Sequence, residues 1–388
     1  MKNTISTIVI TSLPRLTEIT KKEIEALGFK VVATATLSNE IKGTFDDCMF
    51  LNLHLRTANK VLFKIADFEA ATPKEVYNQL IRIKWDTFFT PEDYFTVTSY
   101  AENDYINDTM YPNLLVKDAV ADYFTRKFDK RPNSGSEKDK NALFLHWIKN
   151  KVNVYFDTSG ESISKHGYRL HPHSAPMIEA LAAATVLTTQ WDKNAPFINP
   201  MCGSGTLGIE AALLAINKAP GLLRTNYAFM HSLLFDKKKW GEMRAEAKAQ
   251  VNSEWKGTII MSDLDPKALK AARLNAQEAG VEHLITFEQC DFSRTSIPQE
   301  AGVIMLNPEY GERLGDESHL EEIYKRIGDF FKHECSGYMG YIFTGNMALG
   351  KRIGLKTKRK VEFYNAKIDC RLLEFELYAG SKRAPKEA

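Results

Sequence analysis

After about residue 175, strand-like and helix-like segments alternate along the chain. Apolar segments typical of strands end near Ile198, Met261, Glu288 and Leu306, and helix-forming segments separate them. This alternation is typical of a mostly parallel, doubly wound α/β sheet. Polar motifs directly follow these strands, and such sheets bind ligands at the carboxyl ends of their strands. We therefore predict one ligand site built from these motifs.

The first 160 residues have a different pattern. Strands over 6–11, 31–36, 41–45 and 61–65, with helices around 16–27 and 48–57, give the order βαββαβ of a small ferredoxin-like unit. A second α+β stretch follows. We expect its helices over 73–84 and 114–128, its strands over 94–99 and 152–156, and a polar loop over 130–140.

Composition narrows the classes of protein. The 388 residues include 51 Lys and Arg against 49 Asp and Glu, so any nucleic-acid contact must come from local patches. The five cysteines form no CxxC pair, and the beginning of the chain has only a three-residue apolar run. No window is long and apolar enough for a membrane span. From these features we expect a reduced, cytoplasmic protein with no membrane contact. His171 and His173 have no third ligand at suitable spacing, so we expect no metal.

Two strand ends point to an adenosine cofactor. Gly203 and Gly205 lie between a strand and a helix, where the backbone can approach an anionic group closely. With Gly208 they match the fingerprint of a nicotinamide-dependent dehydrogenase, which stays an alternative. Asp263 and Asp265 end the next strand, where an acidic side chain suits ribose hydroxyls.

The last strand end favours a different chemistry. Asn307 and Pro308 offer an amide oxygen and a fixed carbonyl, and Tyr310 offers a ring. Two acceptors can hold both N–H groups of an exocyclic base amine and orient it for attack, while the ring stacks on the base. A dehydrogenase has no need for this motif, although Asn-Pro is also a common turn.

Several motifs resemble those of the THUMP-domain class I RNA methyltransferases, especially the type that methylates guanine N2 in large-subunit ribosomal RNA. The residues that carry the resemblance are His166 to Arg169 with Lys165, Ala175-Pro176, 199–206 with Ile209 to Ala212, 262–266 with Ala272, Arg273 and Asn275, Cys290-Asp291, and 307–314. The resemblance implies a ferredoxin-like domain over 1–68, a THUMP RNA-binding domain over 69–162 and a Rossmann-like methyltransferase domain over 163–388.

The resemblance also implies roles for single positions. Asn307, Pro308 and Tyr310 would hold the target base. The cofactor S-adenosylmethionine would be bound by Asn199, Pro200, Cys202, Gly203, Gly205, Thr206, Asp263, Asp265 and Asp291. Two residues depart from the family pattern: Asn199 replaces an aspartate, which removes a charge near the sulfonium, and Glu309 replaces a proline.

We expect an S-adenosylmethionine-dependent enzyme that methylates an exocyclic amine of RNA, first of all guanine N2 of 23S rRNA or its large-subunit precursor. An adenine-N6 DNA methyltransferase is the alternative, and a non-catalytic RNA chaperone is a further one. The target base must be flipped out or already unpaired. Phosphate contacts are expected from the cations of 351–360 and, less so, of 126–140.

Overall fold

The computed structural model describes residues 4–106, 108–171, 177–310 and 317–378. His173, Ala175, Pro176 and the end of the last motif, 311–314, lie outside the described residues. The chain forms two compact units. The first comprises 1–13, 20–165 and 219–249, and the second comprises 14–19, 166–218 and 250–388.

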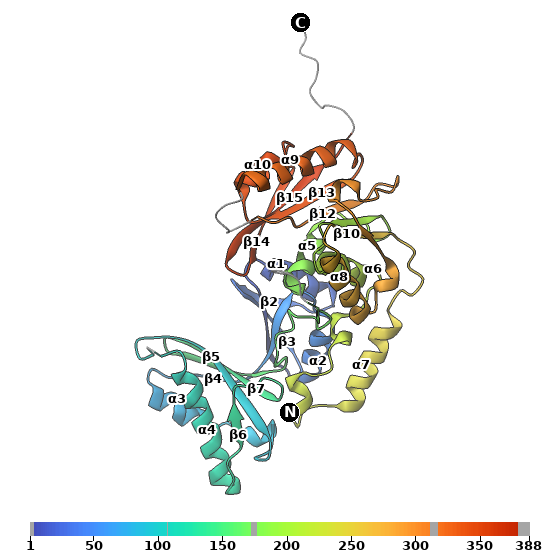
Figure 1. The fold of residues 1–388 in the computed structure, drawn as a ribbon. Coiled ribbons are helices and arrows are strands. Elements are labelled where there is room, and N and C mark those ends of the chain that lie inside the picture. Colours follow the sequence, from blue (N-terminus) through green and yellow to red (C-terminus); the bar gives the residue numbers. More distant parts are fainter. Residues whose placement is uncertain (1–3, 107, 172–176, 311–316, 379–388) are drawn as a thin grey trace. The chain divides into compact units, whose positions relative to one another are not determined.

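The first unit contains one eight-stranded sheet in the order β2-β3-β1-β4-β8-β7-β5-β6 (Figure 1). Its strands are β1 (Ser6–Ser12), β2 (Val31–Ala35), β3 (Ser38–Gly43), β4 (Ala58–Glu69), β5 (Tyr94–Glu102), β6 (Asn133–Gly135), β7 (Asn141–Ile148) and β8 (Lys151–Asp157). Its helices are α1 (Thr17–Ala26, with its first turn in the second unit), α2 (Phe45–His54), α3 (Pro73–Leu80), α4 (Tyr111–Phe128) and α7 (Lys237–Ala249).

The strand β4 joins the two predicted α+β stretches into this one sheet. Its first half pairs with β1, and its second half pairs with β8. The order β2-β3-β1-β4 confirms the ferredoxin-like unit expected from the βαββαβ pattern. Helix α2 begins three residues earlier than predicted because Thr44 and Asp47 form a capping box. The strands β6 and β7 and the helix α7 were not predicted.

The second unit contains a seven-stranded sheet in the order β11-β10-β9-β12-β13-β15-β14. Its strands are β9 (Phe197–Pro200), β10 (Ile259–Asp263), β11 (Ile285–Gln289), β12 (Val303–Leu306), β13 (Met339–Thr344), β14 (Arg359–Asn365) and β15 (Ile368–Glu376). Its helices are α5 (Glu179–Thr188), α6 (Thr206–Ala215), α8 (Pro266–Ala279), α9 (Glu317–His333) and α10 (Met347–Arg352).

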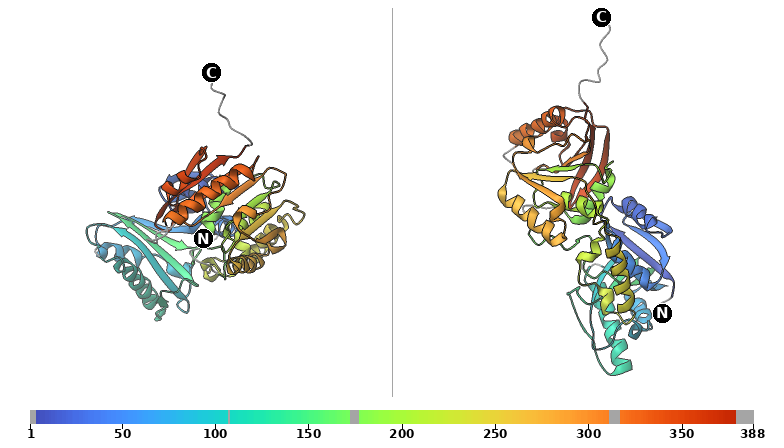
Figure 2. Two further views of the ribbon diagram at one scale, coloured as in Figure 1. Left: turned by 45° about the horizontal axis from the view of Figure 1, so that its top comes forward. Right: turned by 90° about the vertical axis from the view of Figure 1, so that its right-hand side faces the viewer.

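The strands β9 to β13 are parallel, and β15 runs antiparallel to β13. Helices α9 and α10 cover one face of the sheet, and α5, α6 and α8 cover the other (Figures 1 and 2). Tyr324, Ile327 and Phe331 of α9 pack on Ile304 and Ile342 of the strands in one buried core. This architecture confirms the predicted doubly wound sheet. It also brings the carboxyl ends of β9, β10 and β12 together.

Candidate active site

The predicted motifs meet at one edge of the second sheet. Strand β9 lies between β10 and β12, and Ile198 pairs with Ile260 on one side and with Ile304 on the other. Since the three strands are parallel, the residues that follow them emerge side by side. We call 199–206 the glycine loop and 307–310 the acceptor motif. The sheet therefore places the acceptor motif beside the glycine loop.

The glycine loop has an unusual backbone. Met201, Gly203 and Gly205 all have positive φ, at 54°, 55° and 87°. A Cβ on Gly205 would lie 2.6 Å from Met261 Cε and 2.9 Å from Ala272 Cβ, so only glycine fits there. A Cβ on Gly203 would meet nothing within 4 Å. The loop is thus pressed onto β10 and α8 at Gly205, while Gly203 faces open space.

Asp263 holds this loop in place. Its carboxylate accepts hydrogen bonds from the backbone N–H of Gly203 and of Asp265, both at 2.9 Å. Each oxygen takes one of these bonds, so each keeps acceptor capacity for a hydroxyl. The Asp265 side chain accepts from Lys267 N at 2.8 Å and caps α8. The two predicted carboxylates therefore lie together, but Asp265 also has a structural partner.

Asp291 follows β11, the strand that pairs with β10 on the side away from β9. Its Oδ1 accepts from Arg326 at 2.7 Å and from the Ser293 hydroxyl at 2.6 Å. Partial burial raises the pKa of Asp291, but the hydrogen bonds from Arg326 and Ser293 outweigh it, so the pKa lies below its ordinary value. Both contacts use Oδ1, so Oδ2 remains available to a ligand amine.

The contacts of Asn199 explain why this chain has an asparagine where the family pattern has an aspartate. Its Nδ2 donates to the Met305 carbonyl at 2.8 Å, which ties the end of β9 to β12. A carboxylate at this position has no proton to donate to that carbonyl. The side chain is fully buried, and its Oδ1 has no partner among the described residues. An unpaired buried acceptor is costly, so this oxygen is suited to a donor from a ligand.

The acceptor motif contains a second unpaired acceptor. Asn307 Oδ1 is buried and has no protein partner among the residues described. Pro308 is buried and Glu309 is exposed. Tyr310 is half-buried, and its hydroxyl accepts a hydrogen bond from Asn365 Nδ2 at 2.8 Å. Burial raises the pKa of Tyr310 to about 12, so the ring is neutral at physiological pH.

The helix α8 supports the glycine loop through Asn275. This residue belongs to the motifs that carry the family resemblance, but the sequence assigns it no role. Asn275 is fully buried, and its Nδ2 donates to the carbonyl oxygens of Ser204 and His171 at 3.1 and 2.9 Å. Its Oδ1 accepts from His171 N at 2.9 Å. Asn275 thus connects the loop to the segment that precedes the methyltransferase-like motifs.

Sequence reasoning missed Asn365, Gly345 and Arg326. Asn365 in β14 and Gly345 after β13 contact Tyr310, and Arg326 in α9 contacts Asp291; all three come later in the chain. No local motif marks them, because only the folded sheet brings them to the site.

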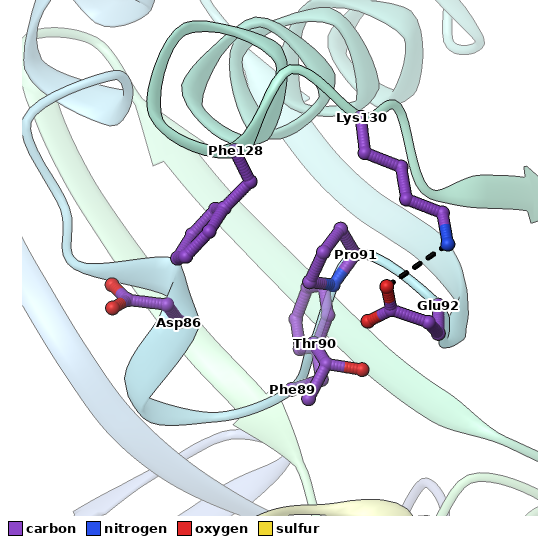
Figure 3. Close-up of a pocket in the computed structure, with 7 residues that line it drawn as sticks. All are labelled: Asp86, Phe89, Thr90, Pro91, Glu92, Phe128 and Lys130. Atoms are coloured by element: carbon purple, nitrogen blue, oxygen red, sulfur yellow. Dashed lines mark hydrogen bonds and ion pairs between the residues drawn. The ribbon is translucent and has the colours of Figure 1, made fainter.

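Of the two predicted basic clusters, 351–360 belongs to the same unit as this site and 126–140 belongs to the first unit. Arg359 pairs with Glu374, which pairs with Tyr341, so the segment before β14 lies toward the amino ends of the parallel strands. In the first unit, Lys127 pairs with Asp86 at 2.7 Å. A hollow of about 390 Å³ lies there, and Lys130, which lines it, pairs with Glu92 at 2.9 Å (Figure 3). These acids weaken both lysines as phosphate ligands.

Burial, with the nearby Asp263 carboxylate, raises the pKa of the Cys202 thiol, so this cysteine is not an activated nucleophile. Within the described ranges, no three His, Cys, Asp or Glu side chains are grouped to hold a metal ion. None of the helices described there has the length and apolar character needed to cross a bilayer.

Models of known protein families match most of the chain. Residues 7–62 match the RlmL ferredoxin-like domain, 70–157 match the THUMP domain, and 166–374 match the RMKL-like methyltransferase domain. The ribosomal RNA large subunit methyltransferase K/L of Syntrophotalea carbinolica is 33% identical over 365 residues, or 92% of this chain and 51% of that protein. The chain thus spans about half the length of the curated K/L relatives it matches.

A shorter relative and two solved structures are also similar. The Synechocystis protein slr0064, provisionally named an RNA methyltransferase, is 32% identical over 84% of this chain and 85% of its own length. A possible methylase of Clostridium difficile 630 has a TM-score of 0.87 and 29% identity, covering 98% of this chain and all of that one. SMU.472, provisionally a methyltransferase, has the same TM-score and 26% identity, with coverages of 99% and 100%.

The SMU.472 structure holds S-adenosylhomocysteine, the product left when S-adenosylmethionine donates its methyl group, which identifies the methyl donor of these proteins. The family match extends over more than half of the chain. The chain belongs to the family of the RMKL-like methyltransferase domain, joined here to ferredoxin-like and THUMP domains.

Proposed function

We propose that this chain transfers a methyl group from S-adenosylmethionine to an exocyclic base amine of RNA, namely guanine N2 of 23S rRNA. The observation that carries the proposal is the unpaired Asn307 Oδ1 beside the glycine loop at one sheet edge. The name of the K/L relatives and the match to a THUMP domain support RNA as the substrate. We also propose the domain boundaries 1–68, 69–162 and 163–388.

The residues of the site fit the cofactor. Gly203 leaves open space at a helix N-terminus, where the methionine carboxylate has favourable electrostatics. Asp263 keeps acceptor capacity for the ribose hydroxyls, and Leu264 beside it is 67% exposed and offers apolar surface to the adenine. Asp291 Oδ2 accepts from the adenine amine. Asn199 Oδ1 is a buried acceptor for the methionine ammonium.

Pro200, Cys202 and Thr206 complete the proposed cofactor side by shaping the glycine loop. Pro200 ends β9, Cys202 N donates to Ser262 O at 2.9 Å, and Thr206 begins α6. The bound cofactor supplies an electrophilic methyl carbon on a positively charged sulfur. The neutral amide of Asn199 leaves that charge uncompensated at this position.

The acceptor motif orients the base amine. Asn307 Oδ1 and the Pro308 carbonyl accept its two N–H groups, which directs the nitrogen toward the donor side. Tyr310 stacks on the base as a neutral ring. Orientation of this kind supplies roughly 7–11 kcal/mol in favourable cases. No general base is needed, since the nitrogen becomes positively charged on methylation and releases its proton to water, and the exposed Glu309 has no assigned role.

The test uses tritiated S-adenosylmethionine with 23S rRNA from cells that lack the protein. We expect label in N2-methylguanosine after nuclease digestion and mass spectrometry. Duplex and single-stranded DNA are tested in parallel. Label in N6-methyladenine of DNA, with none in rRNA, would contradict the proposal.

A further inference from the structure

The hairpin of β14 and β15 reaches the edge of the sheet that carries the acceptor motif. Thr344, the last residue of β13, pairs with Arg371, and the hairpin continues three residues further to Ile368, which pairs with Asn365. At about 3.3 Å per residue, Asn365 lies roughly 10 Å beyond the end of β13. The tip of this hairpin, 365–368, therefore stands beside the loops that follow the parallel strands.

Asn365 fixes the hydroxyl of Tyr310. Its Nδ2 donates to that hydroxyl at 2.8 Å, although the two residues are 55 positions apart. The Cys370 thiol lies 3.9 Å from the same oxygen and is a far weaker partner. The amide of Asn365 is thus the strong hydrogen-bond partner of this hydroxyl among the described residues.

Gly345 fixes the ring of the same tyrosine. A Cβ on Gly345 would lie 2.9 Å from Tyr310 Cδ2 and 3.0 Å from Cε2, so this edge of the ring lies close to the backbone directly after β13. The ring of Phe343 adds an edge contact, with centroids 6.5 Å apart. One side of the Tyr310 ring is therefore packed, and its hydroxyl end is hydrogen-bonded.

We propose that Asn365 is a positioning residue for methyl transfer: it sets the plane of the Tyr310 ring against which the target base stacks. This inference rests on the proposed function and extends it to a residue outside every motif. The base is held at its amine by Asn307 and Pro308, so its remaining freedom is rotation against the ring. A ring released from Asn365 tilts, and a displacement of about 1 Å at a reacting atom lowers a rate by roughly a hundredfold.

The test is a double-mutant cycle in the full chain, with unmodified 23S rRNA and S-adenosylmethionine at saturation. We expect Asn365→Ala to lower kcat by about 10- to 30-fold, with the KM for S-adenosylmethionine unchanged. Tyr310→Phe lacks the hydroxyl, so in that background Asn365→Ala should have no further effect. Asn365→Asp should restore most of kcat, because the tyrosine hydroxyl can donate to a carboxylate.

Asp369→Asn is the matched control, since it alters the same hairpin at an exposed ion pair with Arg371 and does not touch Tyr310. Its kcat should equal that of the wild type. Equal losses from Asn365→Ala in the wild-type and Tyr310→Phe backgrounds, or an unchanged kcat, would overturn this inference alone. A wild-type protein inactive on 23S rRNA would overturn the proposed function and this inference with it.

Discussion

The two sides of the site are built in different ways. On the cofactor side, backbone N–H groups donate most of the hydrogen bonds that hold the loop. Gly203 N and Asp265 N donate to the Asp263 carboxylate, and Cys202 N donates to Ser262 O. On the acceptor side, Asn307 Oδ1 has no protein partner among the described residues, and Tyr310 depends on the side chain of Asn365. Asn199 Oδ1 on the cofactor side is also unpaired among the described residues, so the two sides differ mainly in that backbone hydrogen bonds hold the first and a side chain positions the ring of the second.

Under the proposed function, this difference follows from what each side must recognise. A cofactor is the same in every turnover, so a rigid loop held by backbone hydrogen bonds loses little entropy when it binds. A base that leaves a folded RNA must be captured and oriented, and an acceptor that is not already engaged does this without breaking an existing bond. We therefore expect substitutions on the two sides to affect different kinetic constants.

The largest effect should come from Asn307→Ala. Loss of the amide oxygen removes one of the two acceptors for the amine, and we expect single-turnover methyl transfer to fall by about a thousandfold, as for other preorganised polar groups. The affinity for S-adenosylmethionine, measured by calorimetry, should change less than twofold. Asn307→Asp, which keeps an acceptor, should lose less. A variant that retains wild-type transfer would remove Asn307 from the mechanism.

Two glycine substitutions should separate fold from cofactor binding. Gly205→Ala places a Cβ against Met261 and Ala272 at a φ of 87°, so we expect the second unit to lose about 2–5 kcal/mol of stability. Gly203→Ala meets no protein atom and should cost only about 1–2 kcal/mol for its backbone conformation.

Thermal unfolding and calorimetry with S-adenosylmethionine check this pair. Gly203→Ala should stay folded yet bind the cofactor at least tenfold more weakly, because its methyl group fills the space left for the ligand. Equal thermal shifts in the two variants, or normal binding by Gly203→Ala, would contradict the assigned cofactor side.

The same difference explains what the sequence could reveal. The proposed cofactor side is local: Gly203 and Gly205 follow one strand and Asp263 ends the next, so spacing and strand periodicity predict that these residues lie together. Asn307 and Pro308 were visible as a motif after β12. Asn365 and Gly345 carry no local signal, because β13, β14 and β15 bring them to Tyr310 only in the folded sheet.

The features of the fold that the sequence did not reveal have a related cause. The union of two α+β stretches into one sheet depends on β4, whose 12 residues pair with different strands along its length. The basic segment before β14 lies toward the edge of the sheet opposite the acceptor motif, and its contact with RNA phosphates stays a prediction. Both depend on long-range register, which residue type alone does not determine.

A smaller effect should come from Asn275→Ala, which tests the support beneath the glycine loop. Removal of the amide leaves the buried Ser204 carbonyl without this donor, at a cost of about 1–3 kcal/mol. We expect the KM for S-adenosylmethionine to rise about tenfold, with kcat within twofold of the wild type. Lys270→Ala on the exposed face of the same helix is the control. A fall in kcat at constant KM would place Asn275 on the acceptor side instead.

The smallest effect should come from Arg326→Gln, which removes the ion pair with Asp291. Arg326 is 43% exposed, so the pair is screened and we expect the affinity for S-adenosylmethionine to fall only two- to threefold. The folded pKa of Asp291 lies below its ordinary value, so its contribution is present above about pH 4 and is lost as the pH falls through that lower pKa. Carbon NMR of the Asp291 carboxyl should therefore show its pKa rising toward 3.8 in the variant. An unchanged pKa would mean that the hydrogen bonds from Ser293 alone lower the pKa of this carboxylate. Arg326, and with it helix α9, would then not contribute to the cofactor side.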